Sequence, residues 1–207
     1  DLAGRLASLR SAPLGEDFTG PVLVEGQAAS VLVAQTLVPL FLSQRAPEME
    51  GPQGAALARL PLSPFLTRIG SRVLPEGFSV ADTPSLQRFG GAPVPASYVV
   101  DDDGVPAKDV TLVQDGRLVT LLTGRTPQKR LLQSNGHALG GGAQAAVFQM
   151  ESARGLPAAE LKRKYLDLLK AEGRPFGYIV RGVVDPTEVQ LTSVDEIDVD
   201  EMEALYT

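Results

Sequence analysis

The chain has 207 residues, 43% of them hydrophobic, which is enough to bury one sizeable core. Its 25 acidic and 19 basic residues give a net charge of −6, which argues against nucleic-acid binding because such surfaces cluster Lys and Arg. The absence of cysteine excludes disulfides and thiolate sites and suits a reducing cytoplasm. No apolar run reaches the roughly 18 residues of a membrane span, so we expect one cytoplasmic domain over residues 1–207, with no membrane partner.

The first part of the chain predicts a strand and a buried helix. A β-branched run that begins at Val22, after a Gly-Pro pair, predicts the strand. Residues 27–44 are apolar on most faces, as in a helix buried on several sides, and Pro39 should kink or end this helix near Val38. Prolines and glycines then break any period over residues 46–64, which we expect to form a loop or flap.

The middle of the chain predicts short strands. One is expected at residues 78–82. Two further β-rich runs, 110–113 and 118–121, flank Asp115-Gly116, a pair that tolerates positive φ and therefore predicts a tight hairpin. Residues 133–142 end in three glycines and are too flexible to form a regular element without outside support.

The last part predicts a helix that Pro157 opens and Gly173 closes. Its expected apolar stripe consists of Leu161, Tyr165, Leu168 and Leu169. Strands should follow at 176–184 and 189–194, and the acidic run 195–203 should be solvated. Because helices and strands are mixed without regular alternation, we predict an α+β fold with a largely antiparallel sheet, barrel- or sandwich-like, a buried helix near the N-terminus and a helix near the C-terminus.

Few residues could carry chemistry. A zinc site needs about three ligands, and one histidine with no cysteine argues against it. That histidine, His137, has glycine-rich surroundings that could bring it near a substrate, although a locally bonded or exposed loop histidine is the more common case. A serine triad would have to combine it with a serine such as Ser134, and no Gly-x-Ser-x-Gly elbow is present.

Two other patterns point to ordinary turns. Asp101–Asp103 resembles the start of a calcium loop but lacks the alternating spacing and the distant glutamate of an EF-hand, so we expect a solvated turn. Gly140–Gly142 lacks the Lys-Ser/Thr of a phosphate loop and the spaced glycines of the dinucleotide fingerprint. Nucleotide binding is not expected.

Six segments, in order along the chain, resemble the TldD/PmbA family, whose members are described as peptidases and as modulators of DNA gyrase. They are Gly20 to Ala29, a strand-to-helix entry; Arg72 to Phe78 with Asp82 to Leu86; Asp102 to Pro106; Val113 to Leu118; Ser134 to Ala138; and Gly173 to Arg181. Each segment alone is common, but the ordered set is specific. The resemblance implies that this chain is most of the C-terminal domain of a two-domain protein, with the N-terminal domain absent from it.

The resemblance also implies metal-dependent cleavage of unfolded peptides. Active members carry H-E-x-x-x-H on the helix after the first strand, and a later cysteine completes the zinc site. The corresponding positions here are Ala34, Gln35 and Pro39, and no cysteine exists. Neither Ala34 nor Pro39 has a side-chain lone pair, and neutral Gln35 is a poor general base. We therefore expect no metal, no cofactor and no catalytic residue inherited from the family.

The segment Ser134-Asn135-Gly136-His137 resembles the family's S-T-G-N/H-A element. We take these four residues as candidates for substrate binding, with His137 as the one candidate for catalysis.

The leading expectation is a non-catalytic subunit similar to the PmbA (TldE) branch, which lacks the metal motif and acts as the partner of a TldD-like subunit. It would bind unfolded peptide and form a heterodimer with a metal-bearing TldD-like subunit, or a homodimer. Two alternatives stay open. One is an active peptidase that uses other residues, with His137 and Asp101–Asp103 as candidates; the other is a structural dimerisation domain with helix 27–44 as its interface.

Overall fold

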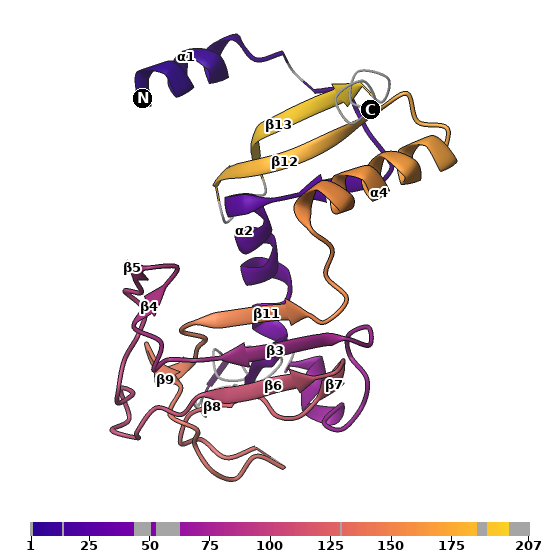
Figure 1. The fold of residues 1–207 in the computed structure, drawn as a ribbon. Helices are drawn as coiled ribbons and strands as arrows, with labels where there is room; N and C mark the ends of the chain where they lie inside the picture. The colour runs from indigo at the N-terminus through magenta and orange to yellow at the C-terminus, as the bar shows by residue number, and fades with distance from the viewer. Residues whose placement is uncertain are drawn as a thin grey trace. The chain divides into compact units, whose positions relative to one another are not determined.

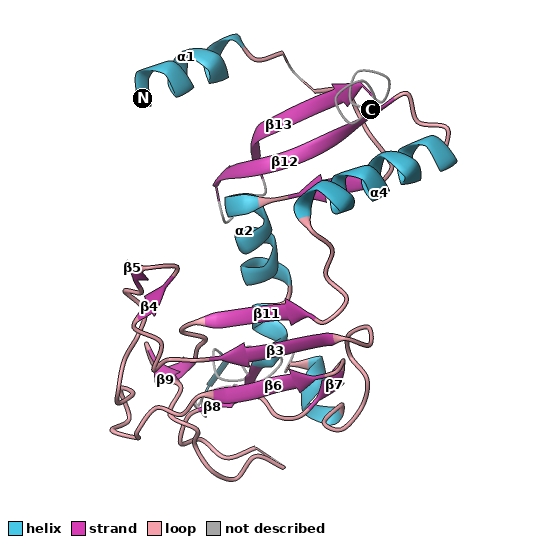
Figure 2. Ribbon diagram, in the orientation of Figure 1, coloured by secondary structure: helices cyan, strands magenta, loops and turns pink. Residues whose placement is uncertain are grey.

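In the computed structural model, the described residues are 2–13, 15–43, 51–52, 63–128, 130–185 and 190–198. The chain divides into two compact units, residues 1–35 with 156–207 and residues 36–155 (Figure 1). Helices and antiparallel strands are mixed, which confirms the α+β prediction (Figure 2). The assignment of a single domain stays a prediction. Within the described residues, no helix combines the length and apolarity that crossing a membrane requires.

The first unit contains a three-stranded sheet with the order β1-β12-β13. Its elements are α1 (Leu2–Ser11), β1 (Val22–Val24), α2 (Gly26–Thr36), α4 (Ala158–Ala171), β12 (Phe176–Asp185) and β13 (Gln190–Asp198). Strand β1 runs parallel to β12, and β13 runs antiparallel to it. The predicted strands are confirmed, but β13 continues to Asp198. The acidic run is therefore strand up to that residue, and the rest of it, 199–203, lies outside the described residues.

Helix α2 confirms the expected effect of Pro39. The helix ends at Thr36, and Pro39 lies in the first turn of a short 3-10 helix, η1 (Val38–Phe41). Ala28 is the one buried residue among the described residues of α2, and Leu32 is 44% exposed. The helix is thus shorter and less buried than its apolar composition predicts.

Helix α4 ends in a Schellman motif. The N–H of Gly173 donates to the carbonyl of Lys170, the N–H of Arg174 donates to that of Leu169, and Gly173 has a φ of 64°. This confirms the predicted closing glycine.

The predicted stripe of α4 is partly wrong. The buried residues are Tyr165, Leu166 and Leu169, whereas Leu161 and Leu168 are exposed by 44% and 48%. The buried face is rotated and includes Lys162, which is half-buried with its Nζ 3.7 Å from Glu25 Oε2. A long lysine side chain can cover apolar surface while its charge reaches a partner.

The second unit is built on a four-stranded antiparallel sheet with the order β11-β3-β6-β7. Its helices and strands are η1, β2 (Leu42–Ser43), η2 (Pro64–Thr67), β3 (Phe78–Asp82), β4 (Arg88–Phe89), β5 (Ala92–Pro93), β6 (Val110–Gln114), β7 (Arg117–Leu118), β8 (Leu122–Thr123), β9 (Ala138–Leu139), β10 (Gly142–Ala143) and β11 (Phe148–Ser152). Three two-stranded pairs, β2-β8, β4-β5 and β9-β10, complete it. All these sheets are open, so the described residues form no closed barrel.

The core of this unit is one apolar cluster. Its buried members are Phe41, Phe65, Val80, Val110, Leu112, Val113, Leu118, Leu121 and Leu122. Phe41 and Phe65 meet edge to face, with ring centroids 5.2 Å apart. Most of the predicted flap, 46–64, lies outside the described residues, and η2 begins at its last residue.

The predicted hairpin is confirmed at β6-β7. Its two-residue turn, Asp115-Gly116, has φ values of 46° and 76°, and Gln114 pairs with Arg117. The second strand is shorter than predicted and ends at Leu118. The chain then continues to β8, which pairs with β2 instead.

Candidate functional site

The positions that correspond to the family's metal motif carry no ligand set. Ala34 and Gln35 lie in the last turn of α2, whereas Pro39 follows the end of that helix, in η1. A methyl group and a pyrrolidine ring offer no donor atom, and zinc binds Cys, His, Asp or Glu. The residues present therefore do not fit a zinc ion. Nor do three or more His, Asp or Glu side chains gather as a metal site anywhere in the described part of the chain.

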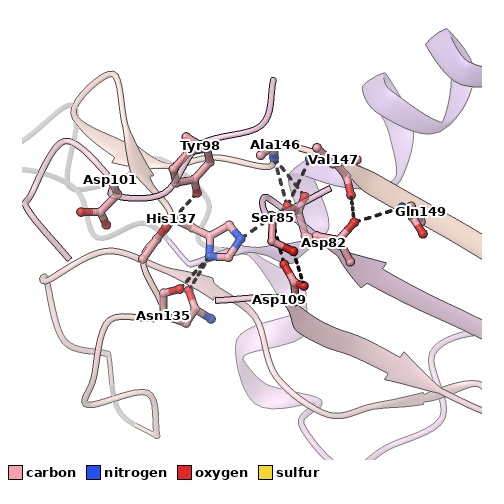
Figure 3. A network of polar contacts seen from close by, with 12 residues as sticks. Asp82, Ser85, Tyr98, Asp101, Asp109, Asn135, His137, Ala146, Val147 and Gln149 are labelled. Carbon is pink, nitrogen blue, oxygen red and sulfur yellow. Dashed lines mark hydrogen bonds and ion pairs between the residues drawn. The ribbon is translucent and has the colours of Figure 1, made fainter. Parts of the chain in front are cut away.

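A buried polar network lies in the second unit (Figure 3). Its centre is a pair of fully buried side chains, Asp82 at the end of β3 and His137 in the segment before β9. His137 Nε2 lies 3.4 Å from Asp82 Oδ1. The carboxylate also accepts hydrogen bonds from the N–H groups of Ala146 at 3.0 Å and Val147 at 3.2 Å. Asp82 is thus held by the two residues that directly precede β11.

The hydrogen-bond partners of Asn135 fix the proton on the imidazole. The side chain of Asn135 donates to the carbonyl of Leu121 and accepts from the N–H of Thr123, which sets the orientation of its amide. His137 Nδ1 lies 3.0 Å from Asn135 Oδ1 and 3.1 Å from its carbonyl oxygen. Both are acceptors, so Nδ1 carries a hydrogen.

The other ring nitrogen, Nε2, faces the carboxylate of Asp82 at 3.4 Å. Nε2 makes no hydrogen bond within the described residues at this distance. The imidazole is therefore oriented chiefly through its contacts at Nδ1.

Tyr98 covers the imidazole and binds the neighbouring backbone. Its hydroxyl donates to the carbonyl of Gly136 at 2.7 Å, and its ring meets that of His137 edge to face at 6.3 Å between centroids. Burial, followed by the charges of Asp82 and Asp101 and that of the nearby Asp102, raises the pKa of Tyr98 to about 12. The phenol therefore stays neutral and remains a donor at physiological pH.

Asp101 is buried, so the prediction of a solvated turn at Asp101–Asp103 is wrong for this residue. One carboxylate oxygen accepts from the N–H groups of Asp103 at 3.0 Å and Val105 at 2.8 Å. The other accepts from the N–H of Ala138 at 3.0 Å. The carboxylate thereby joins two segments that are distant in sequence.

This contact provides the outside support that residues 133–142 lack by themselves. Asp102 adds a second bond by accepting from the N–H of Gly140 at 2.8 Å. The glycine-rich segment consequently forms the β9-β10 hairpin, with Gly140 and Gly141 at φ values of 59° and 88°. A regular element was not expected there from the sequence.

The four candidate substrate-binding residues all belong to this network. Ser134 donates to the carbonyl of Thr123 and accepts from the N–H of Gly136, so it serves as no partner of the imidazole. Asn135 is half-buried, and Gly136 and His137 are buried. Their role in substrate binding stays a prediction, because the contacts described are internal.

Sequence reasoning missed Asp82 and Tyr98 as members of the network. A signal for Asp82 was available, since residues 78, 80 and 82 share one face of β3 by its period of two. Val80 on that face is buried, so a charge two residues later required a buried partner. No comparable local signal marks Tyr98.

The fold and the network define an α+β domain whose single histidine and central acids are used in internal polar contacts. The chain belongs to the family described as the PmbA/TldA metallopeptidase C-terminal domain, whose model matches residues 19–153. No protein among curated sequences matches the chain.

The chain is also similar to solved structures. The chain is similar to a proposed modulator of a DNA gyrase from Thermotoga maritima, with 16% identity and a TM-score of 0.55 over 83% of this chain and 34% of that one. TldE from Thermococcus kodakarensis has 16% identity and a TM-score of 0.49 over 88% and 42%. A proposed modulator of DNA gyrase from Bacteroides thetaiotaomicron has 14% identity and a TM-score of 0.48 over 89% and 35%. The first likeness establishes the fold, and the chain spans about a third of that relative's length.

Proposed function

We propose that this chain is a non-catalytic subunit of a peptidase of the PmbA/TldD type, which binds unfolded peptide and pairs with a metal-bearing relative. The observation that carries the proposal is the set of side chains at the motif positions, Ala34, Gln35 and Pro39. Hydrolysis by zinc requires ligands that hold the ion and a base that takes a proton from its water. Ala34 and Pro39 can do neither, and neutral Gln35 is a poor base.

The buried network supports a role without catalysis. A general base must come within roughly 3 Å of the proton that it removes. The imidazole of His137 is fully buried, with Asp82 and Asn135 against its two nitrogens. These contacts favour a histidine that holds the fold over one that meets a substrate.

The proposed partner supplies what this chain lacks. A subunit without metal ligands can take part in proteolysis only next to one that has them, which places a heterodimer ahead of a homodimer. The chain spans 34% of its Thermotoga relative, so the activity of a whole protein enters here as part of the proposal. We place this assembly in the cytoplasm, because a chain without cysteine has no disulfide that a reducing compartment could break.

The test compares this chain alone, a metal-bearing relative from the same cells alone, and the two together. Elemental analysis is expected to find far less than one zinc per chain in the first sample, and a fluorogenic unfolded peptide should stay intact there. Cleavage and a larger sedimenting species are expected only when the metal-bearing relative is present. Stoichiometric zinc together with chelator-sensitive cleavage by this chain alone would overturn the proposal.

A second comparison separates this proposal from an active site that uses His137. In any preparation that cleaves peptide, His137→Gln should lower cleavage only in proportion to the loss of folded protein. Circular dichroism reports that fraction. Loss of cleavage with folding intact would establish His137 as catalytic and contradict a non-catalytic subunit.

A further inference from the structure

Three exposed arginines gather beside the outer strand of the four-stranded sheet. They are Arg68, Arg72 and Arg117. Arg72 lies directly opposite Arg117 in an isolated antiparallel bridge, next to a backbone hydrogen bond of 2.9 Å from the N–H of Leu118 to the carbonyl of Ser71. The backbone, rather than a choice of side-chain conformation, therefore holds these two positively charged residues side by side.

A close approach at Gly116 fixes this arrangement. The carbonyl of Gly116 accepts from the N–H groups of Val73 at 2.9 Å and Leu74 at 3.1 Å. Gly116 has a φ of 76°, and a Cβ placed on it would lie 2.6 Å from the carbonyl oxygen of Pro75. The segment that follows Arg72 is thus packed directly on the turn that precedes Arg117, and neither arginine can move away with its backbone.

Like charges at directly opposite cross-strand positions are destabilising unless another group compensates for them. Each guanidinium has five N–H donors, and each of the three makes one long contact, of 3.4 Å, with a backbone carbonyl. Within the described residues, none of the three has a carboxylate oxygen within 4.0 Å. By contrast, Arg154 pairs with Glu76 at 3.2 Å and Arg125 with Asp103 at 3.4 Å.

We propose that Arg68, Arg72 and Arg117 form a carboxylate-binding surface that takes an acidic segment of another polypeptide. Guanidinium groups bind carboxylates through two parallel hydrogen bonds, so these unused donors match Asp and Glu side chains. The chain as a whole carries −6, so these three neighbouring arginines are positive against an acidic average. A surface of this length suits a few carboxylates, whereas nucleic acid is bound along an extended track of phosphates. The inference does not depend on whether the chain is catalytic.

The first test uses the unaltered chain with two labelled peptides of equal length, one of alternating aspartate and glutamate and one of alternating asparagine and glutamine. Fluorescence anisotropy should detect binding of the acidic peptide and at least about tenfold weaker binding of the amide peptide. Raising the salt from low to physiological concentration should weaken the acidic complex, because exposed charges are screened. Equal affinity for the two peptides would overturn the proposal.

The second test locates the site. The triple variant Arg68→Gln, Arg72→Gln, Arg117→Gln should bind the acidic peptide at least about tenfold more weakly. This is the effect expected when three weak, exposed ion pairs are lost together. Arg88→Gln is the matched control, because Arg88 is exposed and also donates to one backbone carbonyl, that of Gly91, but lies on the β4-β5 hairpin across the unit from β7 (Figure 1). It should change affinity less than about twofold.

Two outcomes contradict the proposal, one its location and one its ligand. One is a folded triple variant that binds as tightly as the parent, and the other is a single-stranded oligonucleotide of matched charge that binds the parent more tightly than the peptide does. Circular dichroism establishes folding. If the glutamine variant does not fold, the test uses the corresponding triple lysine variant, which keeps the charge but lacks the planar guanidinium group. The proposal requires that this variant binds the acidic peptide more weakly and that its binding still depends on salt.

Discussion

Asp82 joins the end of β3 to the segments that lead to β9 and β11, through its contact with His137 and its bonds to two backbone N–H groups. Asp82→Ala leaves both N–H groups without an acceptor. Each buried donor that loses its partner costs about 1–3 kcal/mol. We expect this variant to lower the free energy of unfolding by about 2–5 kcal/mol in urea titrations.

Asp109 provides the control for that experiment. Its carboxylate accepts from the hydroxyl and the N–H of Ser85, but it is exposed. Asp109→Ala should cost about 1 kcal/mol or less, because water replaces the lost bonds. Equal losses for the two variants would mean that burial of Asp82 contributes nothing.

Tyr98 gives the network a dependence on alkaline pH. Its pKa is raised from 10.0 to about 12, chiefly by burial, so the folded state keeps a proton that the unfolded state has lost between these values. The resulting stabilisation is complete below pH 10.0 and is lost as the pH rises to about 12. Tyr98→Phe should cost about 1 kcal/mol at neutral pH, from its bond to Gly136, and should remove part of the alkaline fall.

Urea unfolding of parent and variant, at about pH 9 and about pH 11, measures both effects of Tyr98→Phe. The difference between the two proteins should be smaller at the higher pH. An unchanged difference would show that Tyr98 does not titrate with folding.

At the scale of elements, two glycines with nearly equal φ allow the cost of backbone strain to be measured apart from the cost of steric overlap. Gly116 has a φ of 76° and Gly104 one of 77°, but a Cβ on Gly116 would collide with the carbonyls of Leu74 and Pro75, whereas nothing lies within 4 Å of one on Gly104. Gly104→Ala should cost about 1–2 kcal/mol, as expected for alanine in this conformation. Gly116→Ala should cost about 1–3 kcal/mol more.

Thermal unfolding of the two alanine variants compares these costs. A Gly116→Ala protein as stable as Gly104→Ala would mean that β7 and the segment beside it can separate without loss. The close approach described for the arginine surface would then be wrong.

Helix α4 offers a matched pair on adjacent residues. Leu169 is fully buried, and Leu168 is 48% exposed. Leu169→Ala should lower the free energy of unfolding by about 2–5 kcal/mol, because it opens a cavity against the sheet. Leu168→Ala should change it by about 0.5 kcal/mol or less, since alanine is a good helix former on the surface.

If both leucine variants lose the same stability, the first unit must bury Leu168 in solution. That result would restore the stripe predicted from the sequence. Denaturant titration of both proteins under identical conditions decides between the two faces.

Local signals predicted the elements well. The Asp115-Gly116 turn and the cap at Gly173 depend on φ values that few residue types adopt, so a short stretch of sequence contains the whole cause. The rotated face of α4 could not be predicted in this way, because Lys162 reaches Glu25, which is far away in sequence. Likewise, the contacts of His137 with Asp82 depend on tertiary structure, so the sequence predicted the histidine as a candidate but not its partner.

At the scale of the whole molecule, the single-domain prediction can be tested by where two core variants act. Leu112, in the second unit, and Leu169, in the first, are both fully buried. If the chain unfolds as one cooperative domain, Leu112→Ala and Leu169→Ala each lower the midpoint of the same transition. Calorimetry should then record one peak in each variant. Two peaks, each shifted by one variant only, would assign two independently folding units.

The carboxylate of Asp101 also constrains the order in which the second unit can fold. It accepts an N–H group from Ala138, 37 positions later, as well as those of Asp103 and Val105 close by. The bonds from Asp103 and Val105 are local and can form early in folding. The bond from Ala138 first requires closure of the long intervening loop, which lowers the entropy of the chain. We therefore expect β9-β10 to form after the β6-β7 hairpin, whose turn has two residues. The hydrogen bond from Ala138 to Asp101 would then form late in folding.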